Sequence, residues 1–386
     1  MKILHVVGGL DPNAGGPSRS VAGLCKSLCE VGCSVALFVH DTKGLAQVDI
    51  GDCEVFKGHG FSAAKGVWRD DFIKAVNAWN PDLVHMHGIW SLFMHEDVKV
   101  CKARGIPYII APRGSLDAWS LRQKWLKKLL ALWLYQRRDL YGAVAIHTTA
   151  ESETKYARAQ GCSQYIIQCP NGVNLPVALP PEERPQCGVL RALFLSRMSE
   201  KKGALDLVEA WGRVRPVNWV CEFVYTVGNE RDRQYEARVK RRVSELSLDD
   251  VMIFTGAMSD EGKWKAYRRS NAFILPTYTE NFGIVIAEAL YAGVPVLTTK
   301  GSPWSGLIKN ECGWWTDIGI SAIAEGLREL AKTSREVLKE MGLRGHDYVA
   351  REFNWATIAN QMKHEYASLL NEMQMKHIMR ESKDDK

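Results

Sequence analysis

The stretch PTYTENFGIVIAEA, residues 276–289, sets two carboxylates, Glu280 and Glu288, eight positions apart. Residues 271–276, which lead into it, form an apolar run that predicts a buried strand, and Gly283 permits a turn from that strand into an apolar helix. Glu280 is then expected at the carboxyl end of the strand. Glu288 follows about two helical turns later, so it can face the same crevice.

The amides at the start of this helix also indicate a binding site. The backbone N–H groups of Asn281, Phe282 and Gly283 are expected at the helix N-terminus, where unpaired donors and the helix dipole favour an anionic or hydroxyl-rich ligand such as a sugar nucleotide. The simpler alternative is that Glu280 caps the helix and Glu288 is solvated. The apolar neighbours of Glu288 argue against its solvation, and an unpartnered carboxylate is costly in such surroundings.

The bulk composition favours a soluble enzyme of two domains. A chain of 386 residues is too long for one ordinary core, and 46% of its residues are hydrophobic. No run of about 18 apolar residues predicts a membrane span, and the amino terminus enters a short strand without the features of a signal peptide, so a cytoplasmic location is expected. The formal charge of +6 is modest. Without a recognition motif it favours anionic lipid or phosphate over nucleic acid as a partner.

The ten cysteines are scattered and include no Cys-x-x-Cys pair. Cys25, Cys29 and Cys33 share a helical spacing that matches no common zinc or cluster signature. A packed helix face in a reducing compartment is the preferred interpretation of these three residues.

Apolar strands alternate with amphipathic helices in both halves of the chain, which predicts two Rossmann-like, doubly wound parallel sheets of the α/β class. The predicted strands are residues 3–7, 35–39, 83–86, 108–111 and 144–147 in the first half and 190–195, 221–227, 251–254, 272–275 and 294–297 in the second. The stretch Val173–Cys187, rich in proline and acidic residues, is predicted to be a linker. Domains are therefore expected at residues 1–175 and 188–354, with ligands bound beyond the carboxyl ends of the strands.

Several motifs in this chain resemble those of one family. The Glu-x7-Glu element is followed by Ala-Gly-Val-Pro-Val at residues 292–296, Arg-x4-Lys-Gly occurs at residues 197–203, and Pro-Asn-Gly-Val occupies residues 170–173. A glycine loop also follows the first predicted strand. In these features, which cover most of the chain, the sequence closely resembles the retaining glycosyltransferases of family 4. Their GT-B fold has two Rossmann-like domains facing across a cleft, and the resemblance implies that the helical tail from about residue 355 crosses back onto the first domain.

The resemblance implies roles for the donor-binding residues. Arg197 and Lys202 flank a turn at a strand end, where cations can stabilise the charge of a leaving diphosphate. Glu288 is implied to hold the ribose and Glu280 to lie near the donor sugar. The amides of residues 281–283 would orient the hydroxyls of that sugar.

The glycine loop of residues 8–17 lacks the Gly-x-Gly-x-x-Gly fingerprint of dinucleotide-binding folds. An ordinary flexible loop is one interpretation, although glycine amides at a helix start can cradle a phosphate. In the family this loop contacts the donor diphosphate or the acceptor. The resemblance therefore implies such a contact for Gly15 and Gly16.

His85 and His87 are expected on the same side of a strand end, because side chains alternate along a strand. The family often has His-x-His here, which implies that His87 contacts the transferred sugar and that His85 supports it. A zinc site is the alternative, but no convincing third ligand is evident and retaining members of the family use no metal for chemistry. Arg113, after the next strand, is a candidate for binding an acceptor phosphate, with a structural role as the alternative.

The segment Asp117–Arg138 predicts a strongly amphipathic helix. One face gathers apolar side chains and the other gathers basic ones; these are Leu121, Trp125, Leu126, Leu129, Leu132 and Trp133 against Lys124, Lys127, Lys128 and Arg138. Packing in a core would explain the apolar stripe. The combination of Trp with a basic face also favours binding to an anionic membrane surface.

The resemblance therefore implies a retaining hexosyltransferase without cofactor or catalytic metal, which uses a UDP- or GDP-sugar. The basic amphipathic helix and a similarity to bacterial O-antigen and capsule glycosyltransferases imply a lipid-linked oligosaccharide of O-antigen or lipopolysaccharide synthesis as the acceptor, reached at the inner face of the membrane by peripheral binding. The alternatives are a sugar-nucleotide epimerase of the same architecture and a catalytically inactive sugar-binding subunit. The presence of Arg197, Lys202, Glu280 and Glu288 together argues against the inactive subunit.

Overall fold

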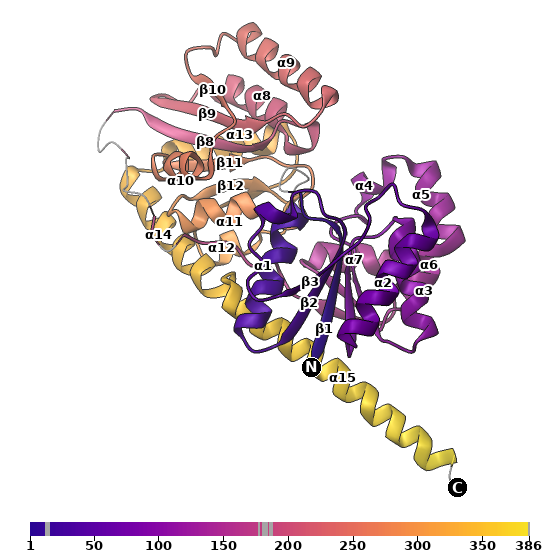
Figure 1. Cartoon of the computed structure of the whole chain (residues 1–386). Helices are drawn as coiled ribbons and strands as arrows, with labels where there is room; N and C mark the ends of the chain where they lie inside the picture. The colour runs from indigo at the N-terminus through magenta and orange to yellow at the C-terminus, as the bar shows by residue number, and fades with distance from the viewer. Residues whose placement is uncertain (12–15, 177, 180–183, 185–187, 385–386) are drawn as a thin grey trace. The chain divides into compact units, whose positions relative to one another are not determined.

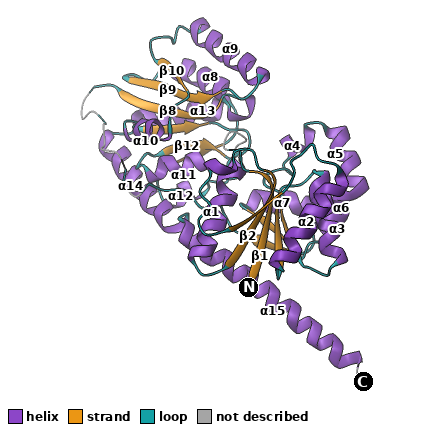
Figure 2. Ribbon diagram, viewed as in Figure 1, coloured by secondary structure: helices purple, strands orange, loops and turns teal. Residues whose placement is uncertain are grey.

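The computed structural model describes residues 1–11, 16–176, 178–179, 184 and 188–384. The chain divides into two compact units (Figure 1): unit 1 is Met1–Asn174 together with Asn354–Lys386, and unit 2 is Leu175–Phe353. Each unit contains one parallel sheet with helices packed against it (Figure 2), which confirms the predicted fold class. Much of the predicted linker Val173–Cys187 lies outside the described residues.

The sheet of unit 1 has seven parallel strands in the order β3-β2-β1-β4-β5-β6-β7. They are β1 (Lys2–Gly9), β2 (Ser34–Asp41), β3 (Glu54–Lys57), β4 (Leu83–His87), β5 (Tyr108–Ala111), β6 (Ala145–Thr148) and β7 (Tyr165–Gln168). The helices are α1 (Gly16–Glu30), α2 (Lys65–Trp79), α3 (Leu92–Ala103), α4 (Ala118–Arg122), α5 (Trp125–Ala131), the π-helix Leu132–Gln136, α6 (Arg137–Gly142), α7 (Glu151–Ala159) and α15 (Trp355–Asp384), with a 3₁₀ turn at Leu45–Gln47. The central strands are almost wholly buried because helices cover both faces of the sheet, and most of their residues are apolar.

Unit 1 has two hydrophobic cores, and α15 is part of one of them. Ile358, Met362 and Tyr366 of α15 are buried in the same cluster as Leu24 and Leu28 of α1. The second cluster contains side chains from α2, α3 and the other face of the sheet. The residues after unit 2 therefore complete the core of unit 1.

The Pro-Asn-Gly-Val motif joins the two segments of unit 1. Val173 pairs with Asn354 in an isolated parallel bridge. Trp355 packs directly on the backbone of Gly172, where an added Cβ would lie 2.3 Å from the indole ring. Glycine is needed at this position because any side chain would displace Trp355.

The sheet of unit 2 has six parallel strands in the order β10-β9-β8-β11-β12-β13. They are β8 (Leu190–Arg197), β9 (Trp219–Thr226), β10 (Met252–Gly256), β11 (Ala272–Leu275), β12 (Val296–Thr299) and β13 (Gly313–Thr316). The helices are α8 (Ala204–Val214), α9 (Glu230–Glu245), α10 (Asp260–Arg268), α11 (Ile284–Tyr291), α12 (Gly306–Lys309), α13 (Ile320–Lys332) and α14 (Arg335–Glu352), with a 3₁₀ turn at Glu200–Lys202. No helix in the described part of the chain is long and apolar enough to cross a membrane.

Candidate active site

The motif residues of unit 2 gather on loops that follow three neighbouring strands, β8, β11 and β12. Arg197 is the last residue of β8, Lys202 ends the 3₁₀ turn that follows, and Glu280 lies on the loop after β11. Lys202 forms an ion pair with Glu280, and the two side chains are only 17% and 10% exposed. These residues therefore lie at or just beyond the carboxyl ends of their strands, as the sequence predicts.

The loops after β8 and β11 are fastened to each other by backbone contacts. The carbonyl of Lys201 accepts hydrogen bonds from the Tyr278 amide at 2.9 Å and from the Thr277 hydroxyl at 3.0 Å. Gly203, with φ of +71°, lies so close to the neighbouring loop that an added Cβ would be 2.1 Å from the carbonyl oxygen of Pro276. The glycine that ends the Arg-x4-Lys-Gly motif is therefore required both for its dihedral angle and for its lack of a side chain.

The loop after β12 also contacts Glu280, the first carboxylate of the Glu-x7-Glu motif. The Glu280 amide donates to the carbonyl of Gly301 at 2.7 Å. An added Cβ on Gly301 would lie 2.5 Å from the carbonyl oxygen of Thr277. Glu280 and its partner Lys202 are thus held by three mutually packed loops, which is the preorganisation that stabilising a developing charge requires.

Arg197 is more loosely held than Lys202. Its side chain is 53% exposed, and its Nε lies 3.8 Å from Oδ2 of Asp232. A solvent-facing cation at a strand end can turn toward an anionic ligand at little cost, because no short hydrogen bond to another described residue holds it. The structure places Arg197 at the end of β8 and Lys202 on the turn that follows, and it gives them separate carboxylate partners.

Glu288 has two partners that the sequence did not predict. Its Oε1 accepts from Lys263 Nζ at 2.8 Å, and its Oε2 accepts from the Tyr267 hydroxyl at 3.0 Å. Burial, together with the Glu288 charge, raises the pKa of Tyr267 well above its usual value, so this hydroxyl remains a donor. Both partners lie on α10, and the hydrogen bonds explain how a 5%-exposed carboxylate is tolerated. The role of Glu288 in holding a ribose stays a prediction.

The turn into α11 agrees with the sequence prediction, and it also shows what Phe282 does. Gly283 has φ of +81° and immediately precedes α11. The Phe282 side chain is buried against Trp304 and Phe353, and its carbonyl accepts from Trp304 Nε1. The ring of Phe282 therefore anchors the turn in the core, so that any ligand contact of this residue must use its backbone. Asn281 lies beside it at the helix start.

Four buried histidines form the polar centre of unit 1. His5, His85, His87 and His147 come from β1, β4 and β6, and burial is the main cause that lowers the pKa of each. The pKa falls to about 3 for His5 and His147, and the Arg113 charge is the second cause of this shift. All four imidazoles are therefore neutral at pH 7. A neutral imidazole carries one proton, so its partners determine which nitrogen holds it.

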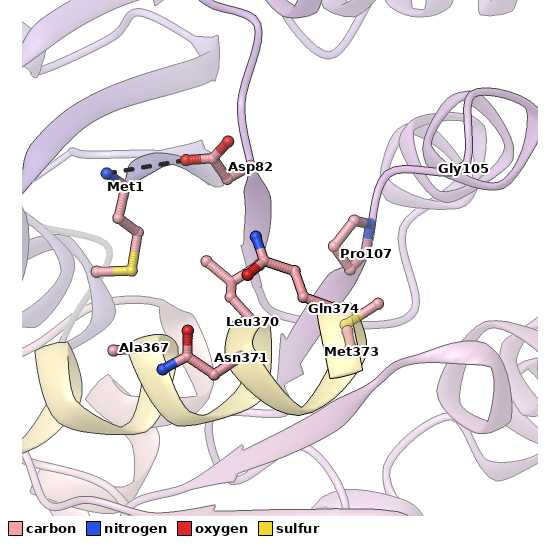
Figure 3. A pocket seen from close by; sticks show the side chains of 9 residues that line it. All are labelled: Met1, Asp82, Gly105, Pro107, Ala367, Leu370, Asn371, Met373 and Gln374. Atoms are coloured by element: carbon pink, nitrogen blue, oxygen red, sulfur yellow. Dashed lines mark ion pairs between the residues drawn. The ribbon is translucent and has the colours of Figure 1, made fainter. Parts of the chain in front are cut away.

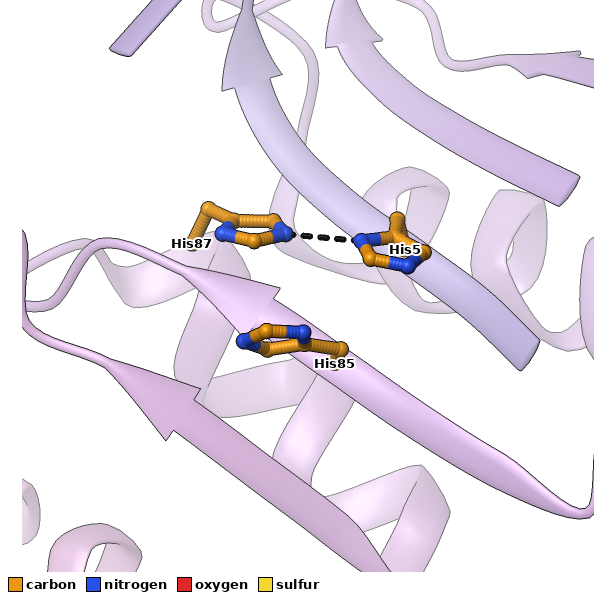
Figure 4. Close-up of side chains that lie close together, drawn as sticks. All are labelled: His5, His85 and His87. Carbon is orange, nitrogen blue, oxygen red and sulfur yellow. Dashed lines mark hydrogen bonds between the residues drawn. The ribbon is translucent and has the colours of Figure 1, made fainter. Parts of the chain in front are cut away.

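One chain of hydrogen bonds begins at Arg113, which can only donate. Its Nη2 lies 2.9 Å from Nδ1 of His87, so His87 carries its proton on Nε2. That proton is donated to Nδ1 of His5, 2.9 Å away (Figure 4). His5 is left with a buried N–H at Nε2 that has no partner among the described residues.

A second chain connects α15 to the same cluster. His147 Nε2 donates to the carbonyl of Cys169 at 2.9 Å, so its Nδ1 accepts from His85 Nε2 at 3.2 Å. His85 Nδ1 then accepts from the Tyr366 hydroxyl at 2.6 Å. The tautomer of every histidine in the cluster follows from these contacts, and neither His5, His147 nor Tyr366 was singled out from the sequence.

The histidine cluster can be compared with the alternative prediction that His85 and His87 bind zinc. His5 supplies the third imidazole that the sequence did not reveal, and one nitrogen each from His5, His85 and His87 lie within 4.8 Å of one another. However, both nitrogens of His85 and His87 are engaged in hydrogen bonds, and the Arg113 cation contacts His87. A guanidinium at that distance repels a metal ion, so these residues fit a metal poorly.

Arg113 itself has two described partners. Nη1 donates to Asn171 Oδ1 at 2.6 Å and Nη2 to His87, while Nε is buried without a partner among the described residues. Its φ of +54° is uncommon for a side chain of this size, so the surrounding contacts must hold it. These contacts give Arg113 a structural role, and its binding of an acceptor phosphate stays a prediction. Gly15 lies outside the described residues, and Gly16 is the first residue of α1.

The segment 117–138 differs from the prediction of a single helix. The backbone breaks at Gln123 and Lys124, where Lys124 has φ of +51°, and a π-helix interrupts the next stretch. Leu132 packs inward and Lys128 donates to the Ser120 carbonyl, contrary to the predicted faces. Six apolar side chains are instead 51–75% exposed and form what we call the α5 surface: Trp125, Leu126, Leu129, Leu130, Trp133 and Leu134.

A pocket of about 640 Å³ lies elsewhere on unit 1 (Figure 3). Met1, Asp82 and Pro107 line it from just before strands β1, β4 and β5, and Leu370 and Gln374 line it from α15. Open parallel sheets bind ligands beyond the carboxyl ends of their strands. The pocket is at the opposite ends, so it is not the candidate site.

Comparisons with known proteins agree with this architecture. Residues 15–172 match the family model of the glycosyl transferase 4-like domain, and residues 183–346 match that of glycosyl transferases group 1. The chain is 22% identical over 296 residues to glycogen synthase of Mycobacterium tuberculosis, covering 73% of this chain and 67% of that protein. It is 27% identical over 218 residues to phosphatidyl-myo-inositol mannosyltransferase of the same organism, covering 53% and 54%.

Solved structures of the same fold cover nearly the whole chain. Sucrose-phosphate synthase from Thermosynechococcus elongatus matches with a TM-score of 0.76 at 20% identity, over 96% of this chain and 99% of that one. Anabaena Alr3699/HepE, solved in complex with UDP and glucose, matches with a TM-score of 0.72 at 16% identity, over 95% and 100%. With two parallel-sheet units, each matching a glycosyltransferase model, the chain is a glycosyltransferase of the GT-B type.

Proposed function

We propose that this chain is a retaining family 4 enzyme that transfers a hexosyl group from a UDP- or GDP-sugar to a lipid-linked oligosaccharide of surface polysaccharide, such as O-antigen. The observation that carries the proposal is the interlocked set of loops holding Lys202 and Glu280, with the exposed cation Arg197 at the end of the strand just before one of them. The UDP complex of a structural neighbour supports a nucleotide-sugar donor. The name of the phosphatidyl-myo-inositol mannosyltransferase supports a lipid acceptor.

The proposed chemistry is a front-face displacement. The bond between the anomeric carbon and the diphosphate oxygen breaks, an acceptor hydroxyl forms the new bond from the same face, and its proton passes to the departing diphosphate. Arg197 and Lys202 stabilise the charge that develops on the diphosphate, Glu288 binds the ribose, and Glu280 lies near the sugar. In this scheme Lys202 leaves its ion pair with Glu280 when the diphosphate arrives.

The roles proposed in unit 1 are different. His87 contacts the transferred sugar with support from His85, and Arg113 binds an acceptor phosphate through the Nε that has no described partner. Gly15 and Gly16 contact the diphosphate or the acceptor. No metal takes part in this scheme, and no carboxylate is assigned as a covalent nucleophile.

Product analysis tests the proposed reaction. The protein is incubated with UDP-, GDP- and ADP-sugars, with and without a soluble oligosaccharide acceptor, and the products are examined by NMR. A new glycosidic linkage with the anomeric configuration of the donor is the expected result, and inversion would contradict it. Conversion of the donor sugar without any acceptor would favour the epimerase, whereas binding without any turnover would favour the inactive subunit.

The α5 surface supports a membrane-bound acceptor. Residues 118–138 contain six basic residues and no acidic one. Exposed apolar side chains beside such charges gain from burial in lipid and from about 1 kcal/mol per basic residue near an anionic leaflet. We therefore place the enzyme on the inner face of the membrane as a peripheral protein.

Vesicle sedimentation should capture the protein at low salt and release it at high salt, because salt screens the attraction. The double variant Lys124→Glu and Lys127→Glu should lose capture, since both side chains are exposed; Lys128 is left intact because it packs against Trp90. The control is Lys155→Glu with Lys332→Glu, which changes the net charge equally at exposed sites elsewhere. Equal capture of the two double variants, or none of the wild type, would defeat the membrane proposal.

A further inference from the structure

Trp90, in the loop after β4, has an unusual backbone conformation. Its φ is +76°, a left-handed value that is a genuine outlier for a bulky residue. Residues in such conformations persist only where the surroundings impose them, and they concentrate at functional sites. Trp90 follows His87 by three residues, so the cause of its conformation bears on the site.

Two side chains of the π-helix Leu132–Gln136 hold the backbone of Trp90. The Trp90 amide donates to Gln136 Oε1 at 2.7 Å, and the Trp90 carbonyl accepts from the Tyr135 hydroxyl at 2.8 Å. Both backbone polar groups of Trp90 are thus satisfied by two consecutive side chains of a helix that lies more than forty residues away in sequence. We call this pair of hydrogen bonds the Trp90 clamp.

The same five-residue helix also carries part of the α5 surface. Trp133 and Leu134, immediately before Tyr135, are 75% and 51% exposed. One side of the π-helix therefore faces solvent while the next residues hold the loop after β4. π-Helices are rare and frequently mark functional sites.

The flanking helices are anchored very differently. On α6, Asp139 accepts from His95 at 2.8 Å, its carbonyl accepts from the Tyr108 hydroxyl, and Leu140 is fully buried. None of the residues of α5 is buried. A π-helix contains one extra residue per turn, so relaxing it to an α-helix would rotate α5 against the fixed α6 by about 100°.

Trp90 also touches the loop that carries Arg113. Its indole Nε1 donates to the Ser115 carbonyl at 3.4 Å, two residues after Arg113. Trp90 thus connects the loop after β4, which begins directly after His87, with the loop after β5, which carries Arg113. A change at the clamp reaches both residues proposed to contact sugar and acceptor.

We propose that Tyr135 and Gln136 are positioning residues that couple lipid docking of the α5 surface to the loop after β4. Docking on an anionic bilayer turns α5, loosens the Trp90 clamp and lets the loop adopt a second conformation for the acceptor. The proposal rests on the lipid docking argued above and adds to it that the lipid regulates the site as well as localising the enzyme.

Hydrogen exchange on the full chain tests the coupling without a known substrate. With vesicles of phosphatidylglycerol and phosphatidylcholine at low salt, the Trp90 amide should exchange about ten-fold faster than in their absence. The Gly88 amide, which is bonded to the Ala111 carbonyl, should not change. In Gln136→Ala, which removes the acceptor, Trp90 exchange should be fast with or without vesicles.

Tyr135→Phe is the gentler variant, since it deletes only the hydroxyl. It should speed Trp90 exchange without vesicles and leave vesicle capture intact. The matched control is Tyr141→Phe on α6, whose hydroxyl donates to Gln160 instead of the loop; it should behave as the wild type. Capture of the wild type with unchanged Trp90 exchange would overturn the coupling but leave the docking standing. Absence of capture would overturn the docking itself, and the coupling with it.

Discussion

Acidification below pH 6.5 should destabilise unit 1 far more than unit 2. The four buried histidines have pKa values lowered by burial, to about 3 for His5 and His147, whereas an unfolded chain titrates near 6.5. Between these values the unfolded state binds protons that the folded state does not, so stability is full above pH 6.5 and is lost as the pH falls. Each histidine contributes about 1.4 kcal/mol per pH unit in that window.

Three buried carboxyls oppose this loss. Burial raises their pKa, to about 6 for Asp97, so the folded state takes up their protons first and gains stability as the pH falls; they are Asp97, Asp139 and Glu153. The effect of the four imidazoles exceeds that of the three carboxyls. The free energy of unfolding of unit 1 should therefore fall by roughly 1.4 to 5 kcal/mol per pH unit. That is a large share of the stability of an ordinary domain.

Urea unfolding at pH 7.5, 6.5 and 5.5, with hydrogen exchange to separate the units, measures this effect. The midpoint of unit 1 should change little between pH 7.5 and 6.5 and fall clearly between pH 6.5 and 5.5. Unit 2 contains a single histidine, His346, and serves as the internal control. A unit 1 midpoint that stays level or rises on acidification would show that the cluster is not held neutral.

Arg197→Ala should reduce turnover on the order of 100-fold while leaving the free energy of unfolding almost unchanged. Losing one donor aimed at developing charge costs about 3 kcal/mol in the transition state. The half-exposed side chain has only a 3.8 Å contact with Asp232, so folding loses little. Lys202→Ala should lose similar activity and also some stability, because Glu280 is left nearly buried without its partner.

Steady-state kinetics and urea unfolding of the same preparations provide the measurement. Arg231→Ala is the matched control. Arg231 is an exposed arginine near the start of α9, and it forms an ion pair with Glu200. The control variant should retain normal turnover. If Arg197→Ala turns over within two-fold of the wild type, the diphosphate role of Arg197 is wrong.

The strands inside each sheet could be predicted from sequence, but several at the edges could not. The strands without a prediction are β3, β7 and β13, each four residues long and partly exposed at the edge of its sheet. An edge strand is covered less completely, so it needs no continuous apolar run and leaves a weak pattern. The strand-end positions of the Arg-x4-Lys-Gly and Glu-x7-Glu motifs followed from strong central strands.

The partners of the site residues were beyond prediction for a different reason. His5 meets His85 because β1 pairs with β4 in a particular register, and Lys263 meets Glu288 because α10 packs beside α11. Periodicity tells which face a residue takes, but not which strand is its neighbour or how the two are aligned. The clamp on Trp90 depends in addition on a π-helix, for which the sequence has no recognised signature.

Unit 1 is built from two segments that are far apart in sequence, and this affects the order in which the two units can fold during synthesis. Unit 2 is encoded by one uninterrupted stretch and can fold as soon as it leaves the ribosome. One of the two cores of unit 1 stays incomplete until unit 2 has been made, because that core includes Ile358, Met362 and Tyr366. Until then, the apolar side of α1 is uncovered and is a natural target for chaperones.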